Sequence, residues 1–237
     1  MTQNKYTLEP CIYSDSLLNK LAELNITAVK YKCDQVDITY IKKGLSFAKY
    51  YHGQQMRKSG EPYYSHPIIV AEMVSNHMFR ENPIIAALLH DTLEDTTLTL
   101  SEIEQEFNPR IAQIVDRLTR KIDPATGKKM SAGECLLKAH ELGDMESMLI
   151  KMYDRWHNVT TIDSMSKEKQ EKIARETLDY FLILNTYLQM SNEKKESQML
   201  IINSKLHQES NEIISRDDFL ILSLGLQNTT PHKQNLP

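Results

Sequence analysis

The chain has little glycine and little proline, with 7 glycines and 8 prolines among 237 residues. Counts this low are unusual for a protein rich in loops or built from β-strands. No segment shows the alternation of apolar and polar residues that is typical of a strand. The sequence therefore predicts an all-α fold.

Cysteines are also few. The three present (Cys11, Cys33 and Cys135) are scattered along the chain and odd in number. This pattern argues against a disulfide framework and against a zinc site made of cysteines. The first residues, MTQNKYTLEP, have no apolar core of a signal peptide, and no apolar run approaches a membrane-spanning length. We therefore expect a cytoplasmic protein in a reducing compartment, without a membrane partner.

An excess of positive charge is missing as well. The 28 basic and 32 acidic side chains leave a net charge of −4. This balance gives no general attraction for nucleic acid or for an anionic membrane surface, so neither is expected as a partner. An anionic ligand would have to meet a local basic patch.

Apolar residues at spacings of three and four predict the helices. The segment IIAALLHDTLED (residues 84–95) is apolar nearly all round, so we expect it to form one buried central helix. Thr99 and Glu102 form a capping-box pattern, and the apolar period that follows continues to Leu118. Other helices are expected over residues 16–31, 38–52, 134–142, 145–158 and 167–189, with one more that begins near Pro67.

Three regions are predicted along the chain. Residues 1–36 form an N-terminal extension with one short helix, residues 37–190 form the main helical domain, and residues 191–237 form a C-terminal helical extension with a disordered tail. A polar break, SNEKKESQ, separates the last two regions. The apolar clusters within residues 199–226 fit terminal helices that pack either on the core or on a partner subunit, so a homodimer is one interpretation.

Imidazole and carboxylate groups recur beside apolar helical segments. Such a set is costly to bury unless something binds it, and it is the ligand set of a divalent metal ion. Because this candidate ligand set contains no thiolate, manganese is our first choice of ion, with magnesium, iron or zinc as alternatives. The candidate ligands are His52, His66, His90, Asp91 and Asp154. The other five histidines, His157 among them, are interpreted as surface or ordinary core residues.

Two further carboxylates follow the candidate ligands at helical spacing. Glu94 and Asp95 lie one turn after His90 and Asp91, where a general acid or base would act on water. The alternative is that they are ordinary charges at a helix end. Asn158 follows Asp154 by four residues and could hold a phosphate or orient water.

Basic residues lie in the loop between His52 and His66. Arg57 offers a bidentate fork to phosphate, and Lys58 offers a point charge, although solvated surface charge is the alternative reading.

Four segments together carry a family resemblance. They are HGQQMRKSGEPYYSHPIIVA, AALLHDTLEDT, LIKMYDRWHN and KIARETLDYF, all within residues 37–190. The order of the histidines and aspartates in these segments resembles the HD superfamily of metal-dependent phosphohydrolases. The amino-acid sequence around them resembles the hydrolase domain of the RelA/SpoT family. The resemblance implies an HD-type helical bundle around a central metal-binding helix and one Mn²⁺ ion. It also implies hydrolysis of the 3′-diphosphate of (p)ppGpp to GDP or GTP and pyrophosphate.

The resemblance also implies roles for individual residues. The two aspartates and three histidines named above become the metal shell, and Glu94 with Asp95 matches the acidic pair of active hydrolases. Nucleotide contacts are implied for Lys43, Arg57, Lys58, Ser59 and Asn158.

The chain departs from the family pattern near Asp154. Tyr153 replaces an alanine, Trp156 replaces a leucine, and Val159-Thr160 stands where Met-Arg is common, so one arginine contact is missing. Two alternative functions therefore stay open. One is an HD phosphohydrolase of another nucleotide, such as an NADPH phosphatase or a nucleotidase. The other is a regulatory module that binds the alarmone without hydrolysing it.

Overall fold

The computed structural model describes residue 6 and residues 9–182, and this part of the chain is helical. It contains no strand, only two isolated β-bridges, Met56 with Pro62 and Ile122 with Lys129. The all-α prediction is confirmed. The predictions for residues 183–237, namely the end of the 167–189 helix, the terminal helices and the tail, lie outside the described residues.

The chain divides into two compact units, Met1–Ser164 and Met165–Pro237. In the second unit the structure describes α10 (Lys167–Glu176) and the π-helical turn η2 (Thr177–Leu182). The first unit consists of α1 (Ile12–Tyr31), α2 (Ile38–His52), α3 (Ser65–Ser75), α4 (Glu81–Leu89), α5 (Thr92–Asp95), α6 (Leu100–Glu106), α7 (Pro109–Leu118), α8 (Ala132–Glu141), α9 (Met145–Thr160) and η1 (Ile162–Ser164). The boundaries of a hydrolase domain at residues 37 and 190 stay a prediction.

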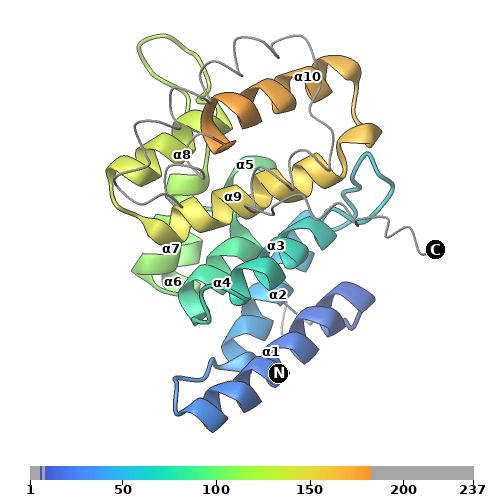
Figure 1. Ribbon diagram of the computed structural model, residues 1–237, viewed down its shortest axis with the longest axis vertical. Helices are drawn as coiled ribbons and strands as arrows, with labels where there is room; N and C mark the ends of the chain where they lie inside the picture. The colour runs from blue at the N-terminus through green and yellow to red at the C-terminus, as the bar shows by residue number, and fades with distance from the viewer. Residues whose placement is uncertain (1–5, 7–8, 183–237) are drawn as a thin grey trace, which may run out of the picture. The chain divides into compact units, whose positions relative to one another are not determined.

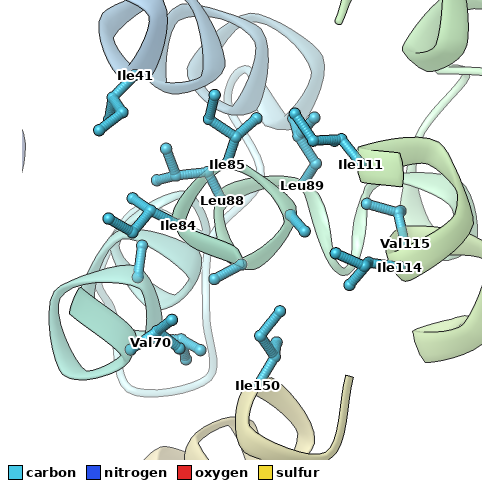
Figure 2. Close-up of a cluster of buried hydrophobic side chains, with 14 of the residues drawn as sticks. Ile41, Val70, Ile84, Ile85, Leu88, Leu89, Ile111, Ile114, Val115 and Ile150 are labelled. Atoms are coloured by element: carbon cyan, nitrogen blue, oxygen red, sulfur yellow. The ribbon is translucent and has the colours of Figure 1, made fainter. Parts of the chain in front are cut away.

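Helix α4 is the centre of the first unit. It packs against α2, α3, α7 and α9, and its residues from Pro83 to Leu89 are all buried. Figure 2 shows its side chains among those of the neighbouring helices; the labelled residues are Ile41, Val70, Ile84, Ile85, Leu88, Leu89, Ile111, Ile114, Val115 and Ile150. A helix surrounded in this way needs apolar residues on every face, as the sequence indicated.

Helix α1 belongs to the same compact unit. It begins at Ile12, earlier than predicted, because Cys11 and Ser14 cap its N-terminus. The amide of Cys11 donates to Ser14 Oγ, and this hydroxyl donates to the Cys11 carbonyl. Leu17 and Leu21 are fully buried in the core, where α1 packs on α3 and α2. The extension predicted at residues 1–36 therefore contributes to the core of the first unit.

One predicted helix is in fact two. The capping box of Thr99 and Glu102 is present at the start of α6, but the apolar period that continues to Leu118 is broken between α6 and α7. The side chain of Asn108 accepts a hydrogen bond from the amide of Ile111 (2.9 Å), and Pro109 has no amide hydrogen to continue α6. Local capping chemistry therefore overrides a period that fits one helix.

Candidate metal centre

Four of the predicted ligands converge in the first unit. His66 lies in the first turn of α3, His90 and Asp91 lie between α4 and α5, and Asp154 lies on α9. Helices α3, α4 and α9 pack against one another, so residues far apart in the sequence meet at one place.

The chain breaks its helix at this place. Residues 84–95 were expected to form one helix, but α4 ends at Leu89 and a separate short helix, α5, begins at Thr92. The ring of His90 donates through Nδ1 to the carbonyl of Ala87 (2.7 Å), and the hydroxyl of Thr92 donates to the carbonyl of Leu89 (2.6 Å). These two side chains donate to carbonyl groups that would otherwise accept hydrogen bonds from the amides of the next helical turn, which explains the break.

The ligand atoms are close enough to share one ion. One ligand atom each from His66, His90 and Asp91 lie within 4.8 Å of one another. The Nε2 atom of His66 is 3.2 Å from Asp154 Oδ1 and 3.6 Å from Asp91 Oδ2. The Nε2 atom of His90 is 3.3 Å from Asp91 Oδ1 and 3.8 Å from Asp154 Oδ1. Two imidazoles and two carboxylates therefore face a common point.

An unsatisfied nitrogen supports the fit to a cation. The Nε2 atom of His90 is buried and makes no hydrogen bond within the structure. Buried polar atoms without a partner are rare, and the Nδ1 proton of this ring is already used by Ala87. A nitrogen lone pair beside two carboxylates suits a divalent ion.

The electrostatics of the centre point the same way. Burial works to lower the pKa of His90, but the charges of Asp91 and Asp154 overcome it and raise that pKa to about 9. Burial works to raise the pKa of Asp154, but the cation of Lys151 and the nearby imidazoles of His66 and His90 hold it well below its ordinary range. Both carboxylates are therefore ionised, and the site favours positive charge between them.

Lys151 supplies part of that positive charge. It is a buried lysine on α9, and its Nζ lies 3.0 Å from Asp154 Oδ2. Oδ1 of the same carboxylate also accepts a hydrogen bond from Asn158 Nδ2 (2.6 Å). These contacts fix the orientation of Asp154. Lys151 was not among the predicted site residues, although its i,i+3 spacing to Asp154 was a signal.

His52, the fifth predicted ligand, lies outside the group of close ligand atoms. It donates or accepts through Nδ1 with Gln55 (3.0 Å), and its ring stacks on Tyr63 with centroids 4.7 Å apart. Its Nε2 is also buried without a hydrogen bond. Its role as a ligand stays a prediction.

Glu94 is held in an ion-pair cluster. Its carboxylate accepts from the guanidinium of Arg120 and lies 2.8 Å from Lys129 Nζ, and Oε1 also accepts from the Arg120 amide (2.7 Å). Burial works to raise the pKa of Glu94, but these hydrogen bonds lower it. Glu94 is thus an ionised anchor for the segment that joins α7 to α8. Neither basic partner could be predicted from helical spacing, because Arg120 and Lys129 are distant from Glu94 in the sequence.

Asp95 is linked to the centre through a tyrosine. The hydroxyl of Tyr63 lies 2.9 Å from Asp95 Oδ2 and 3.0 Å from Asp91 Oδ2, and it can donate to only one of them at a time. Burial and the two carboxylates raise the pKa of Tyr63, so the hydroxyl keeps its proton. Tyr63 was not singled out in the sequence, although it precedes His66 by one helical turn.

The basic loop reaches the end of α9. Arg57 donates to Thr161 Oγ1 (3.0 Å) and more weakly to Asn158 Oδ1 (3.5 Å), while Lys58 and Ser59 are exposed. The loop turns at Gly60, whose φ of +91° favours glycine, and Arg57 donates its amide to the Glu61 carbonyl (2.8 Å). Arg57 and Asn158 are therefore brought together next to Asp154.

Lys43 is placed differently. Its Nζ lies 3.0 Å from Glu106 Oε2 and 5.0 Å from the centre of the Phe107 ring. Its described partners belong to the end of α6 and not to the metal centre. A contact with substrate is therefore not supported by its packing and stays a prediction.

Comparison with known proteins decides the family. A family model described as an HD domain matches residues 44–189. The chain belongs to the HD domain family. The four candidate ligands that converge are a histidine, the adjacent histidine–aspartate pair and a distant aspartate, in the order of the family resemblance. They lie on α3, at the α4–α5 junction and on α9.

Curated relatives match the HD domain over most of this chain. A GTP pyrophosphokinase rsh of Brucella ovis is 38% identical over 176 residues, which cover 72% of this chain and 23% of the relative. A guanosine-3′,5′-bis(diphosphate) 3′-pyrophosphohydrolase of Aquifex aeolicus is 39% identical over 158 residues, covering 66% and 22%. The chain thus spans about a quarter of the length of the curated relatives it matches.

A solved structure shares the fold. It is described as a metazoan orthologue of SpoT that hydrolyses ppGpp; it has a TM-score of 0.50 and 22% sequence identity, and the match covers 72% of this chain and 95% of that one. The likeness supports the all-α HD architecture. In the part of this HD domain protein that the structure describes, no helix is long and apolar enough to cross a membrane.

Proposed function

We propose that this protein is a metal-dependent hydrolase that removes the 3′-diphosphate of (p)ppGpp. The products would be GDP or GTP and pyrophosphate, and the preferred ion would be Mn²⁺. The observation that carries the proposal is the convergence of His66, His90, Asp91 and Asp154, with a buried His90 Nε2 that has no hydrogen-bond partner. The substrate follows from the Aquifex aeolicus relative, which is named a 3′-pyrophosphohydrolase of this nucleotide.

The four converging residues would hold the ion. A divalent cation bound there would supply Lewis acidity and would lower the pKa of water. In the reaction, a water oxygen bonds to the phosphorus attached to the 3′ oxygen, the bond from that phosphorus to the 3′ oxygen breaks, and the 3′ oxygen takes up a proton as pyrophosphate leaves.

The two acidic residues after the HD pair would then have different roles. Asp95 is exposed and its carboxylate accepts from the Tyr63 hydroxyl, so it is the carboxylate better suited to accept the water proton. Glu94 is neutralised by two cations and would instead hold Arg120 and Lys129 at the edge of the site. The hydroxyl of Tyr63 lies between Asp91 and Asp95 and can donate to either carboxylate, so it links the two.

The diphosphate would meet the basic loop. Arg57 is already oriented by Thr161 and Asn158, and Asn158 contacts the ligand Asp154, so the guanidinium lies close to the centre. Lys58 is exposed beside it and can approach phosphate without breaking an ion pair. Ser59, exposed next to Lys58, would contact the rest of the nucleotide, and a contact from Lys43 would require its ion pair with Glu106 to open.

The test is pyrophosphate release from ppGpp by the purified chain. We expect release with Mn²⁺, with GDP as the co-product, and none after treatment with EDTA. NADPH serves as the rival substrate: phosphate release from NADPH alone would replace the alarmone with another nucleotide. Bound ion without turnover of either substrate would favour an alarmone-binding module.

Replacement of Arg57 is expected to weaken substrate binding. Arg57→Ala should raise KM for ppGpp by about 10-fold or more, because a charge-assisted bidentate contact to phosphate is lost. Arg57→Lys should recover only part of this loss, since lysine restores the charge without the fork. Steady-state kinetics of both variants measure the effect. An unchanged KM in both would place the phosphates elsewhere.

A further inference from the structure

His66 and His157 form a buried imidazole pair. Their Nδ1 atoms are 2.7 Å apart, and their rings stack with centroids 4.8 Å apart and an interplanar angle of 30°. His66 is 1% exposed and His157 is 6% exposed. The pair joins α3 to α9, two of the helices that carry the metal centre.

The short distance between these nitrogens requires one donor and one acceptor. When both rings are neutral, one Nδ1 carries a proton and the other offers a lone pair. The direction of the hydrogen bond therefore decides the tautomer of both rings.

The tautomer of His66 decides whether it can ligate an ion. Its Nε2 faces Asp154 Oδ1 at 3.2 Å and Asp91 Oδ2 at 3.6 Å. A cation binds only the lone pair of Nε2, so the proton of a neutral His66 must then be on Nδ1. With the proton on Nε2, the same ring would instead donate to Asp154 and could not ligate.

His66 and His90 differ in what determines which ring nitrogen carries the proton. His90 Nδ1 faces the carbonyl of Ala87, which can only accept, so its Nε2 is always the free nitrogen of the neutral ring. His66 Nδ1 faces an imidazole, which can either accept or donate. The ligating tautomer of His66 therefore depends on its partner.

We propose that His157 is a positioning residue: it accepts the Nδ1 proton of His66 and thereby holds the Nε2 lone pair of His66 toward a divalent cation. This inference rests on the metal-dependent function proposed above. The position of His157 is secured from its own helix, because Thr160 Oγ1 (2.8 Å) and Thr161 Oγ1 (3.2 Å) both donate to its carbonyl. Outer hydrogen bonds of this kind fix ring orientation and ligand basicity in metal sites.

Two variants of similar size separate acceptance from packing. In His157→Asn, the amide oxygen can take the position of Nδ1 and still accept, whereas His157→Leu fills the space without an acceptor. Calorimetric titration of the full chain with Mg²⁺ or Mn²⁺ alone should show affinity about 10- to 100-fold weaker for His157→Leu. His157→Asn should stay within a few-fold of the unsubstituted protein. Equal affinity in both folded variants and the unsubstituted protein would overturn the inference.

A measurement on the unsubstituted protein keeps the inference testable even if His157→Leu does not fold. Nitrogen-15 NMR of the histidine rings in the Mg²⁺-loaded protein should show the proton of His66 on Nδ1 and that of His157 on Nε2. A proton on Nδ1 of His157 in the loaded protein would overturn it. Failure of this inference can be told apart from failure of the proposed function. If the protein binds the ion with His66 in this tautomer but does not hydrolyse ppGpp, the proposed function is wrong and the role of His157 still holds.

Discussion

Asp91→Ala is expected to abolish measurable pyrophosphate release and to weaken divalent-ion binding by at least about 100-fold. Loss of an outer partner of a metal ligand commonly costs 10- to 100-fold, and loss of a ligand should cost more. Asp91 lies close to both histidines of the centre, at 3.3 Å from His90 Nε2 and 3.6 Å from His66 Nε2. Its removal therefore deprives both imidazoles of one of the two carboxylates that they share, and Asp154 alone remains.

The fold should survive this substitution. Asp91 contacts the polar groups of Tyr63, His66 and His90 and none of the apolar core around α4, so the metal-free variant should keep the helical circular dichroism spectrum of the unsubstituted protein. Asp116→Ala on α7 is the matched control, since this carboxylate pairs with Lys121 in a partly exposed ion pair. Turnover should be unchanged in Asp116→Ala. Full turnover in Asp91→Ala, with ion still bound, would remove the metal centre proposed here.

Asp144→Ala is expected to cost about 2–4 kcal/mol of unfolding free energy. Asp144 caps α9 through the amide and hydroxyl of Ser147, at 3.3 Å and 2.9 Å. Its carboxylate, 1% exposed, also pairs with Arg110 (2.8 Å) and with Arg117. The substitution therefore removes a helix cap and leaves Arg117 without its carboxylate, while Arg110 keeps Glu146 as a partner. Urea unfolding monitored by circular dichroism measures the change.

The same carboxylate makes stability depend on pH. Burial works to raise the pKa of Asp144, but hydrogen bonds from Arg117, Ser147 and Arg110 lower it below the ordinary value of 3.8. A group with a depressed folded-state pKa stabilises the protein above its unfolded-state pKa, and this contribution is lost as the pH falls through the folded-state pKa. The difference in stability between the unsubstituted protein and Asp144→Ala should therefore be full at neutral pH and should shrink below about pH 4.

A surface ion pair provides the comparison for this prediction. Asp116→Ala removes a contact to Lys121 whose two side chains are 34% and 51% exposed, so it should cost less than about 1 kcal/mol. If both aspartate variants lost the same small amount of stability, the cluster around Asp144 would not stabilise α9.

The prediction of the acidic pair shows where sequence spacing is limited. The i,i+4 argument for Glu94 and Asp95 assumed one helix through the HD pair, but the helix breaks between Leu89 and Thr92. The break depends on where the His90 ring and the Thr92 hydroxyl donate. Spacing cannot reveal which carbonyl a side chain takes, so the ion pairs of Glu94 with Arg120 and Lys129 were not foreseen.

The histidines show a related limit. Spacing and motif order named His66 and His90 as ligands and interpreted His157 as an ordinary residue. His157 is one of three residues between Asp154 and Asn158 on the same helix, a neighbourhood that could have drawn attention to it. Its contact with His66 joins residues 91 positions apart, which only the packing of α3 on α9 brings together.

The sequence by itself determined the all-α class, the buried character of the central helix, the order of the metal-binding motifs and the family. These properties are local. Composition and motif sequences are visible along the chain, and apolar periodicity follows from helical geometry. Only the tertiary structure decided that His52 lies outside the close ligand group, that Glu94 is neutralised by Arg120 and Lys129, and that His157 contacts His66. Those properties depend on contacts between distant helices and on the direction of single hydrogen bonds, which local patterns do not encode.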